Sequence, residues 1–454
     1  MTLFLTKYRG WFMVGVVFVE LFIVCGPTFN YSIVFVSLQD EFNAGAALTG
    51  WVGSLANAVM GAAAPVSSPL IQRFGPRAVT VTGLVVFSGG LVATSFVPAL
   101  SYAYLTFGLL VGLGANFVFQ SGIELLFNWF PDENCSRAIS LALLGTSFSV
   151  LSFAPLLNSL ITAYQWRNAL GIIGGGSAVL GLVFGVFIST PAEASPREDG
   201  QESRGDDGAE SPASQEGENT GTGRQRIVRI LLKLDTWLWG LCLLLVYLGW
   251  TFVTVNYASF LEHDLLFTKD QVTIAIMLFA VGDIVGKILL SAIGDHLPCL
   301  KLYVVVVSSV LGALVSWLMT KLHTVPLVYT VSLFMGSIRS GSYAMPFPAT
   351  MEIFGEYGSH IVTTLSMMPY GIGILIGAPI SGGLYDLTGD YTLSLLVIVA
   401  IFVCSAIVAL MIPIRTRIHS SNYRFSFRPT STKSKEISVA YLHSTSQFTA
   451  QPRL

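Results

Sequence analysis

An apolar stretch of the chain, FAVGDIVGKILLSAIGD at residues 279–295, carries a carboxylate at Asp283 and an ammonium group at Lys287. Side chains four residues apart lie on one face of a helix and can form an ion pair. Because an ionised side chain at the centre of a bilayer costs on the order of 3 kcal/mol, such residues are rare and usually mark a transport pathway. The sequence leaves two interpretations open. The pair is either a salt bridge that fixes this helix to its neighbours or a switch for coupled transport.

The switch would work through charge balance. A proton taken up by Asp283 leaves Lys287 without its counter-ion, and a substrate carboxylate can replace that ion. Proton and anion then cross as a neutral load, which avoids roughly 2.3 kcal/mol per charge for every 100 mV of membrane potential. The pair therefore predicts proton-coupled transport of a small organic anion.

Further polar side chains in apolar segments are candidate contacts for the substrate or the proton. Arg339 is a candidate second anion-binding group, with pairing to Glu20 or packing near the membrane surface as the alternatives. Glu20 is a candidate for a proton role or for polar packing between helices. Asn30 and Tyr31 are predicted either to bind substrate or to hydrogen-bond between helices, and Asn116 is a weaker substrate-binding candidate.

Charged residues near the ends of apolar segments are candidates for a gate. Two loops, SPLIQRFGPRAV (68–79) and SAIGDHLPCLKL (291–302), share a helix end of small residues, a polar turn and a basic residue, which indicates an internal repeat. Some of the candidates lie in or beside such loops, and for the two glutamates a gate or helix-end pairing is favoured over the alternative of contact with the substrate. The gate candidates are Glu124, Arg137, Asp295 and Glu352.

The composition places these residues in a membrane protein. Of 454 residues, 53% are hydrophobic and 11% are charged, whereas ordinary soluble domains carry roughly 25% charged residues. The apolar runs are long enough to cross a bilayer core of about 30 Å as helices. We therefore expect an all-α polytopic membrane protein of twelve transmembrane helices. The spans lie near 11–36, 47–71, 78–97, 102–127, 138–163, 168–190, 236–261, 271–294, 301–320, 324–351, 361–385 and 391–414.

The spans form two groups of six around a polar segment. That segment is rich in Pro, Gly, Ser and acidic residues and predicts a disordered linker. Lys and Arg concentrate at one side of the membrane, which predicts cytoplasmic termini and a cytoplasmic linker. The predicted organisation is a cytoplasmic N-terminus (1–10), a first six-helix bundle (11–190), the linker (191–235), a second bundle (236–414) and a cytoplasmic tail (415–454).

Several function classes are not supported by the sequence. No phosphate-binding loop motif and no Ser-His-Asp arrangement occurs, so we expect neither ATP-driven transport nor an enzyme. The net charge of −2 and the lack of a basic cluster argue against a nucleic-acid partner. The five cysteines are scattered, and their spacing fits no metal site. The helix glycines, among them Gly112, Gly114, Gly371, Gly373 and Gly377, are expected to allow close packing and bending.

The two halves resemble the major facilitator superfamily, whose folds place the substrate near the membrane midplane between the halves. More specifically, four motifs spread over most of the membrane region resemble the monocarboxylate transporter family. They are GLLVGLGANF (108–117), YQWRNAL (164–170), GDIVGKILLSAIGD (282–295) and IGAPISGGLYDLTGDYTLSL (376–395).

The resemblance implies a secondary transporter of small monocarboxylates in the plasma membrane, with a proton as co-substrate and no other cofactor. It also implies that Phe347, between two prolines, contacts the substrate and affects its size, although a core aromatic residue is the alternative. Some relatives travel with a single-span immunoglobulin-like glycoprotein, which is a candidate partner here. Three departures indicate a divergent member: Lys287 replaces the family arginine, Asn30 and Tyr31 occupy the region of a span-1 lysine, and the signature entering span 5 is largely lost.

These departures keep three hypotheses open. The first is proton-coupled transport of small monocarboxylates. The second is facilitative transport of neutral or aromatic amino acids or other organic solutes, as in some relatives. The third is a membrane receptor or scaffold that no longer transports.

Overall fold

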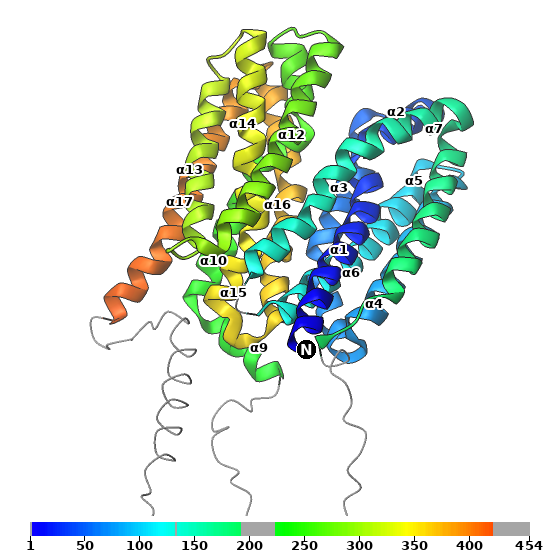
Figure 1. The fold of residues 1–454 in the computed structure, drawn as a ribbon. Coiled ribbons are helices and arrows are strands. Elements are labelled where there is room, and N and C mark those ends of the chain that lie inside the picture. Colours follow the sequence, from blue (N-terminus) through cyan, green and yellow to red (C-terminus); the bar gives the residue numbers. More distant parts are fainter. Residues whose placement is uncertain (1, 132–133, 192–222, 421–454) are drawn as a thin grey trace, which may run out of the picture. The chain divides into compact units, whose positions relative to one another are not determined.

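The computed structural model describes residues 2–131, 134–191 and 223–420, and every structural statement below refers to these ranges. Within them the chain is helical and contains no strand. Contacts divide the chain into one compact unit, Met1–Leu410, and a second, Met411–Leu454. The first predicted bundle and the second as far as Leu410 belong to the first unit, which holds the candidate site (Figure 1).

The N-terminal bundle is built from long helices with few connecting residues. Its elements are α1 (Thr2–Phe29), α2 (Tyr31–Phe42), α3 (Ala46–Ala62), α4 (Ala64–Ser95), α5 (Leu100–Ala103), the π-helix η1 (Tyr104–Val111), α6 (Gly112–Trp129) and α7 (Cys135–Val186). Two of these helices change direction inside their bounds. Gly75 in α4 and Gln165 in α7 have non-helical backbone angles, so each helix holds parts of two spans.

The C-terminal bundle has the same number of spans. Its elements are α10 (Leu234–Val255), α11 (Tyr257–Ser259), the π-helix η2 (Phe260–Asp264), α12 (Lys269–Ile293), the 3-10 helix η3 (Gly294–His296), α13 (Leu302–Met319), α14 (Val325–Ala344), α15 (Pro346–Phe354), the 3-10 helix η4 (Gly355–Tyr357), α16 (Ser359–Thr388) and α17 (Thr392–Ser420).

The predicted twelve spans all correspond to helical segments. Nine helices in the described ranges are long and apolar enough to cross a membrane. Helix α7 supplies two spans, α3 continues into the first part of α4 as another, and α14 with α15 forms the last. Helix α14 is less apolar than these nine helices because it carries Arg339 among several serines.

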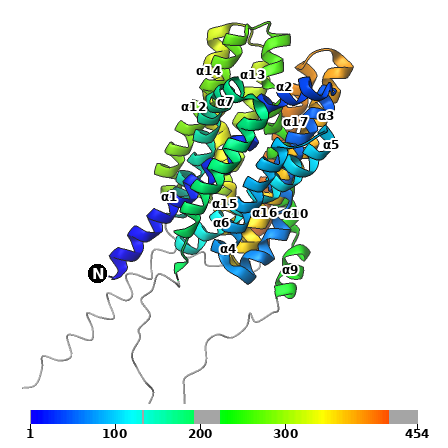
Figure 2. The same ribbon diagram turned by 90° about the vertical axis from the view of Figure 1, so that its right-hand side faces the viewer.

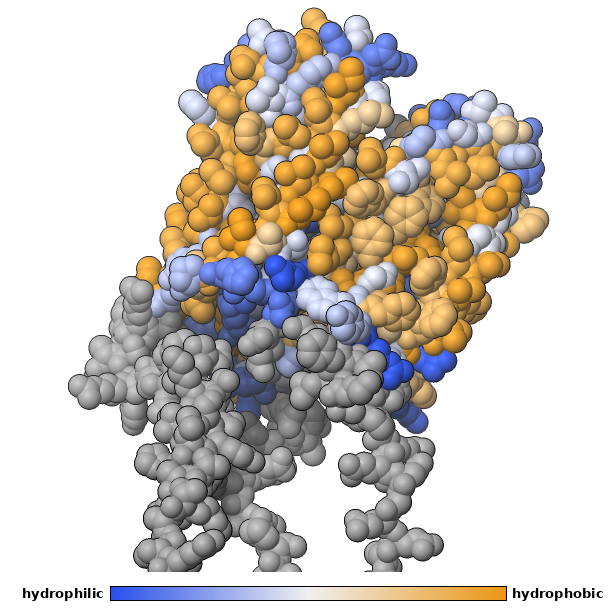
Figure 3. All heavy atoms as spheres, in the orientation of Figure 1, coloured by the Kyte–Doolittle hydropathy of each residue, from blue (hydrophilic) through white to orange (hydrophobic). Residues whose placement is uncertain are grey.

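The surface agrees with this count. Over the face drawn in Figure 3, apolar side chains cover most of the length of the helices, and hydrophilic residues gather toward the ends. Many of the exposed side chains are large and apolar, such as Val179 on α7, Leu314 on α13 and Phe334 on α14. In water such a surface would be unfavourable, whereas lipid tails match it.

The first span of each bundle breaks at an asparagine. Asn30 separates α1 from α2, and Asn256 separates α10 from α11. Both lie at the same distance along the chain from a tryptophan near the start of the span, Trp11 or Trp237. In α1 the break follows Pro27, which cannot donate a backbone hydrogen bond. The matching breaks support the predicted internal repeat.

The two bundles contact each other mainly through two helix pairs, α3 with α16 and the first half of α7 with α12, and α16 also contacts α4 and α6. In a repeat of six spans, span 2 corresponds to span 8 and span 5 corresponds to span 11. The pair of spans 2 and 11 is therefore equivalent to the pair of spans 5 and 8. At the first pair, Gly61 and Gly371 bring the backbones into direct contact, as expected for Gly371. Gly112 and Gly114 likewise face backbone atoms of neighbouring helices, which confirms their predicted packing role.

One end of the first unit is called the linker face. Here α1 begins, α7 begins and α9 (Gly223–Leu232) lies, as Figures 1 and 2 both show. Helix α9 corrects the sequence prediction, which placed a disordered linker over 191–235. Its sequence RIVRILL alternates basic and apolar residues at helical spacing, and Ile230 is buried. The average composition of the long linker hid this short pattern, and 192–222 lie outside the described residues.

The predicted N-terminus and tail also differ from the structure. Helix α1 begins at Thr2, well before the predicted start of span 1 at residue 11. Helix α17 continues to Ser420, past the predicted end of span 12 at residue 414. The remainder of the predicted tail, 421–454, lies outside the described residues.

Candidate functional site

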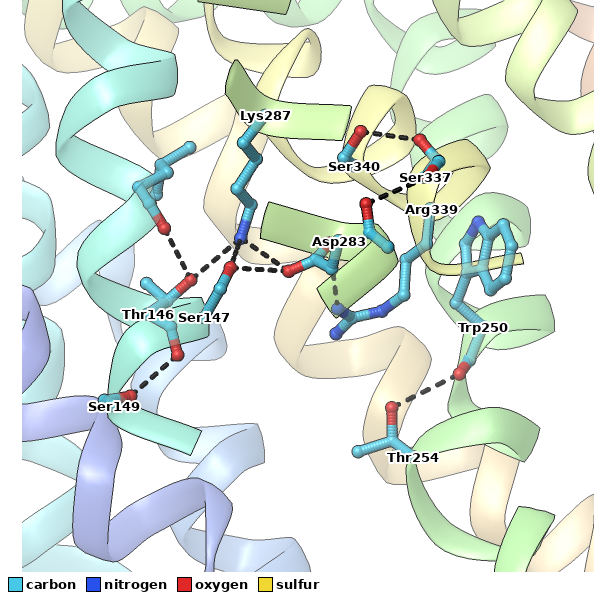
Figure 4. A network of polar contacts seen from close by, with 12 residues as sticks. Thr146, Ser147, Ser149, Trp250, Thr254, Asp283, Lys287, Ser337, Arg339 and Ser340 are labelled. Atoms are coloured by element: carbon cyan, nitrogen blue, oxygen red, sulfur yellow. Dashed lines mark hydrogen bonds and ion pairs between the residues drawn. The ribbon is translucent and has the colours of Figure 1, made fainter. Parts of the chain in front are cut away.

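The predicted ion pair forms in the interior. Lys287 Nζ lies 2.9 Å from Asp283 Oδ2, and both residues are almost fully buried. Two hydroxyl groups of α7, in the other bundle, complete the environment: Lys287 donates to Thr146 Oγ1 at 3.0 Å and to Ser147 Oγ at 2.6 Å. Ser147 in turn donates to Asp283 Oδ2 at 2.6 Å. Figure 4 shows these side chains converging from the two bundles.

Arg339 adds a second cation to this cluster. Its Nη1 lies 3.5 Å from Asp283 Oδ1, on the side of the carboxylate opposite Lys287. Its guanidinium stacks 3.9 Å from the ring centroid of Tyr343 and 5.5 Å from that of Phe279. Of the alternatives left open by the sequence, pairing with Glu20 is therefore wrong. Two cations now share one carboxylate, and the cluster carries a net charge of +1.

Close packing of α12 and α14 fixes the geometry of these charges. A Cβ added at Gly282 would meet the carbonyl oxygen of Leu333, and one at Gly286 would lie 2.7 Å from the carbonyl oxygen of Ser337. A Cβ at Gly336 would lie 2.8 Å from the backbone nitrogen of Asp283. Because only glycine fits at these positions, the two helices approach closely, and Asp283 of α12 reaches Arg339 of α14.

The cluster lines a cavity of about 300 Å³. Asn30, at the break in span 1, lines it, and its Nδ2 also donates to Gly26 O at 2.8 Å. Phe347 lines it as well, and its ring lies 6.2 Å from that of Phe119 in the other bundle. The structure thus brings together Asp283, Lys287, Arg339, Asn30 and Phe347 around one space.

Three predicted contacts lie away from this cavity. Tyr31 packs between α2 and α3 and donates to Thr49 O at 2.8 Å. Asn116 donates to Met60 O at 2.7 Å inside the N-terminal bundle. Glu20 is buried, its carboxylate has no hydrogen-bond partner in the described structure, and its Oε1 faces Gly185. The substrate-contact prediction is corrected for these residues, because each side chain points between helices of its own bundle.

Contacts between the bundles close the linker face. Asp295 in η3 accepts hydrogen bonds from the backbone N–H groups of Ser136 and Arg137, each at 2.9 Å. These are the first residues of α7, where exposed N–H groups and the helix dipole favour a carboxylate. Arg137 Nε donates to Ser291 O at 3.2 Å. The predicted gate candidates Asp295 and Arg137 therefore meet across the two bundles.

Neighbouring polar contacts join the same two bundles. Gln120 of α6 donates to Thr364 of α16 at 3.2 Å, and Ser359 donates to Asn128 Oδ1 at 3.3 Å. Together with the Phe119–Phe347 ring pair, these contacts lie between the charged cluster and the linker face. On the opposite side, the surface in Figure 3 is hollowed between the ends of the two bundles.

The two predicted glutamates of the gate network behave differently. Glu352 stays within its own bundle, where it accepts from Lys301 N and Lys301 Nζ, each at 2.7 Å. This is the helix-end pairing left open by the sequence. Glu124 is buried in α6, and its Oε2 has no hydrogen-bond partner in the described structure.

A further ion pair on the linker face ties α10 to the turn before α16. Lys233 Nζ lies 2.8 Å from Glu356 Oε1. The hydrogen bond from Lys233 holds the pKa of Glu356 below its ordinary value. Both side chains are exposed, so water screens the pair and it contributes at most about 1 kcal/mol. It connects elements of one bundle and is not a gate.

Removal of the Asp295 carboxylate tests the gate. We expect Asp295→Asn to shift the carrier toward conformations in which the linker face is open, because Asn lacks one of the two accepting oxygens and the negative charge that the helix dipole favours, which together are worth about 1–2 kcal/mol. That energy corresponds to roughly a 5- to 30-fold change in population. Labelling of a cysteine introduced at Ser291 by an impermeant reagent measures opening, with Asp270→Asn, an exposed carboxylate in the first turn of α12, as the control. Unchanged labelling in Asp295→Asn would contradict the gate.

The sequence analysis missed several residues of the site. Thr146 and Ser147 gave no signal, because hydroxyl side chains are common in membrane helices and only the tertiary structure brings them to Lys287. Three tyrosines line the cavity as a cluster, with ring centroids 5.3–6.0 Å apart. One of them had a signal, because Tyr343 follows Arg339 by one helical turn. The cluster consists of Tyr247, Tyr343 and Tyr370.

A helical membrane protein with two repeated six-span bundles and a charged cavity between them has the architecture of a secondary transporter. Comparison with known proteins supports this class of protein. The Major Facilitator Superfamily family matches residues 17–244 and 239–440. The chain is 27% identical to monocarboxylate transporter 13 of Bos taurus over 405 residues, which cover 89% of each chain. It is 30% identical to monocarboxylate transporter 11 of Mus musculus over 401 residues, covering 86% of this chain and 84% of the relative.

The chain therefore belongs to the monocarboxylate transporter family of the major facilitator superfamily, as a divergent member. Its identity to monocarboxylate transporter 12 of Mus musculus is 26% over 401 residues, which fits this divergence. The protein is a multi-pass membrane transporter and not an enzyme, and the resemblance inferred from the motifs is confirmed.

Proposed function

We propose that the protein carries monocarboxylate anions together with a proton. The observation that supports this proposal is the cluster of two cations, Lys287 and Arg339, around one carboxylate, Asp283, at the wall of the cavity. A substrate carboxylate supplies the missing negative charge. Hydrogen bonds between ionised partners are about twice as strong as neutral ones, so the anion gains both charge and direct contacts.

The charges favour an anion over a zwitterion. An amino acid would bring an ammonium group that needs a carboxylate of its own. Among the described residues that line the cavity, Asp283 is the only carboxylate, and both Lys287 and Arg339 already contact it. The site therefore supports the monocarboxylate hypothesis better than transport of neutral amino acids.

Asp283 is the residue that would take up the proton. If Asp283 takes up a proton as the anion binds, the site has the same net charge of +1 when empty and when loaded. The cycle then moves no net charge across the membrane potential. Without the proton, the empty site would be positive and the loaded site neutral, and the potential would oppose one of the two steps.

The arrangement of gates supports alternating access. Contacts on the linker face close one end, while the surface on the other side is hollowed between the two bundles. We propose that the linker face is cytoplasmic, since Lys and Arg concentrate there, and that the protein acts in the plasma membrane. A rocking motion at the α3–α16 and α7–α12 pairs would then expose the site to each side in turn.

Uptake into proteoliposomes tests the proposal. Purified protein should take up a radiolabelled monocarboxylate faster when the outside is acidic than when both sides have the same pH, and Arg339→Gln should raise the apparent KM at least about tenfold. Arg73→Gln, at an exposed position, is the matched control. An uptake rate that is independent of the proton gradient would favour a facilitative carrier. If neither the wild type nor Arg339→Gln takes up any acid, a receptor or scaffold would be favoured.

A further inference from the structure

The cavity has one charged wall, and the rest of its lining is mainly aromatic and aliphatic, with a few polar side chains such as Asn30 and Asn57. Asp283, Lys287 and Arg339 lie on α12 and α14, and the three tyrosines and the Phe119–Phe347 ring pair line other parts of the same space. A ligand that fills this space must present a negative group to one wall and a largely apolar body to the rest.

The volume exceeds what a three-carbon acid needs. A cavity of about 300 Å³ equals the share of about ten water molecules in the liquid, at about 30 Å³ each. Lactate or pyruvate has about six non-hydrogen atoms, so it would leave a large part of the space to water. An acid with a phenyl-sized body would fill it and remove more apolar surface from water.

The aromatic walls also have a suitable geometry. Tyr247, Tyr343 and Tyr370 meet edge to face, with interplanar angles of 81–89°. Rings arranged in this way present both edges and faces, and a further ring can pack against them at centroid distances of about 4.5–7 Å. Arg339 stacks on Tyr343, so a carboxylate bound to the guanidinium lies directly beside this aromatic cluster.

We infer that the transported monocarboxylate carries an aromatic body, as in an aryl-substituted hydroxy or keto acid. This inference rests on the proposed function and specifies its substrate class. The aromatic amino acids themselves are poor substrates, because their ammonium group finds no free carboxylate in the cavity lining. Three-carbon acids bind at the same charges but leave the aromatic cluster unused.

Matched pairs of acids test this inference. Uptake into proteoliposomes is measured for lactate against 3-phenyllactate and for pyruvate against phenylpyruvate, with phenylalanine as the zwitterionic counterpart. The apparent KM of each phenyl acid should be at least about tenfold lower than that of its parent, because burial of a ring adds several apolar contacts. Phenylalanine should compete at least about tenfold less well than 3-phenyllactate.

A cavity-filling variant provides an independent arm. Val150 of α7 lines the cavity, so Val150→Phe should lower the preference for phenyl acids over their parents at least about tenfold. Val179→Phe is the matched control, because Val179 lies on the same helix and its side chain is exposed. It should leave the preference unchanged.

The outcomes separate the two proposals. Equal KM values within both pairs, with normal uptake of the parent acids, would overturn the aromatic substrate class and leave the carrier proposal standing. A preference that Val150→Phe and Val179→Phe change equally would also overturn it, because the ring would then lie outside this cavity. Failure of every acid to be taken up would instead contradict the proposed function.

Discussion

Replacement of Asp283 by asparagine should reduce monocarboxylate uptake at least about 100-fold. The substitution keeps the shape of the side chain, but in the empty carrier it leaves Lys287 and Arg339 as two buried cations without a counter-ion, so the return of the empty carrier is disfavoured. Breaking a buried ion pair by removing one partner costs about 3–5 kcal/mol, and each 1.4 kcal/mol is about a factor of ten in an equilibrium. The measurement is the initial rate of radiolabelled uptake by purified protein in proteoliposomes.

Two variants separate function from stability in this experiment. Asp270→Asn removes an exposed carboxylate from the same helix and should leave uptake unchanged. Asp283→Glu keeps the charge and should fold even where Asp283→Asn does not, with reduced but measurable uptake. If Asp283→Asn folds and retains uptake within about threefold of the wild type, the pair is only a structural salt bridge.

The second large effect is expected from a single added methyl group. Gly371→Ala should lower the rate of transport at least about tenfold, because the α3–α16 seam has no room for a Cβ. An added Cβ would meet the backbone nitrogen of Ala62 and the carbonyl oxygen of Ala58, and would lie 2.8 Å from the carbonyl carbon of Gly61. Overpacking costs about 1–3 kcal/mol, and here backbone atoms cannot move aside as a side chain would.

The same helix offers a matched control. Gly383 also lies in α16, but an added Cβ there would meet no atom within 4 Å. Gly383→Ala should therefore leave transport and thermal stability unchanged, or raise stability slightly through better helix propensity. Transport rates and melting temperatures of both variants are measured side by side. Equal effects of the two substitutions would show that α3 and α16 do not need this close approach.

Local sequence patterns determined the membrane class and the span count. Apolar runs of sufficient length must be helical in lipid, because every backbone polar group has to be satisfied within the segment. The ion pair of Asp283 and Lys287 was also predictable, since positions one turn apart on a helix meet whatever the fold. The family followed from short motifs that survive divergence, and the comparisons confirmed it.

Patterns averaged over long segments were less informative. Helix α9 was hidden in a polar linker, and the asparagine breaks at Asn30 and Asn256 carried no composition signal. Helix α14 shows a related case, because its arginine and serines weaken the membrane signal at the candidate site.

The sequence by itself determined that this protein is a twelve-span transporter of the monocarboxylate family with an intramembrane ion pair. Only the tertiary structure decided that Arg339 is the second cation beside Asp283, and that Thr146 and Ser147 accept hydrogen bonds from Lys287. It also decided that three other candidates point away from the cavity, namely Tyr31, Asn116 and Glu20. The physical reason is the distance along the chain over which each kind of information acts. Helical periodicity fixes which residues share a face within one helix, whereas the partner of that face depends on packing between segments far apart in the chain.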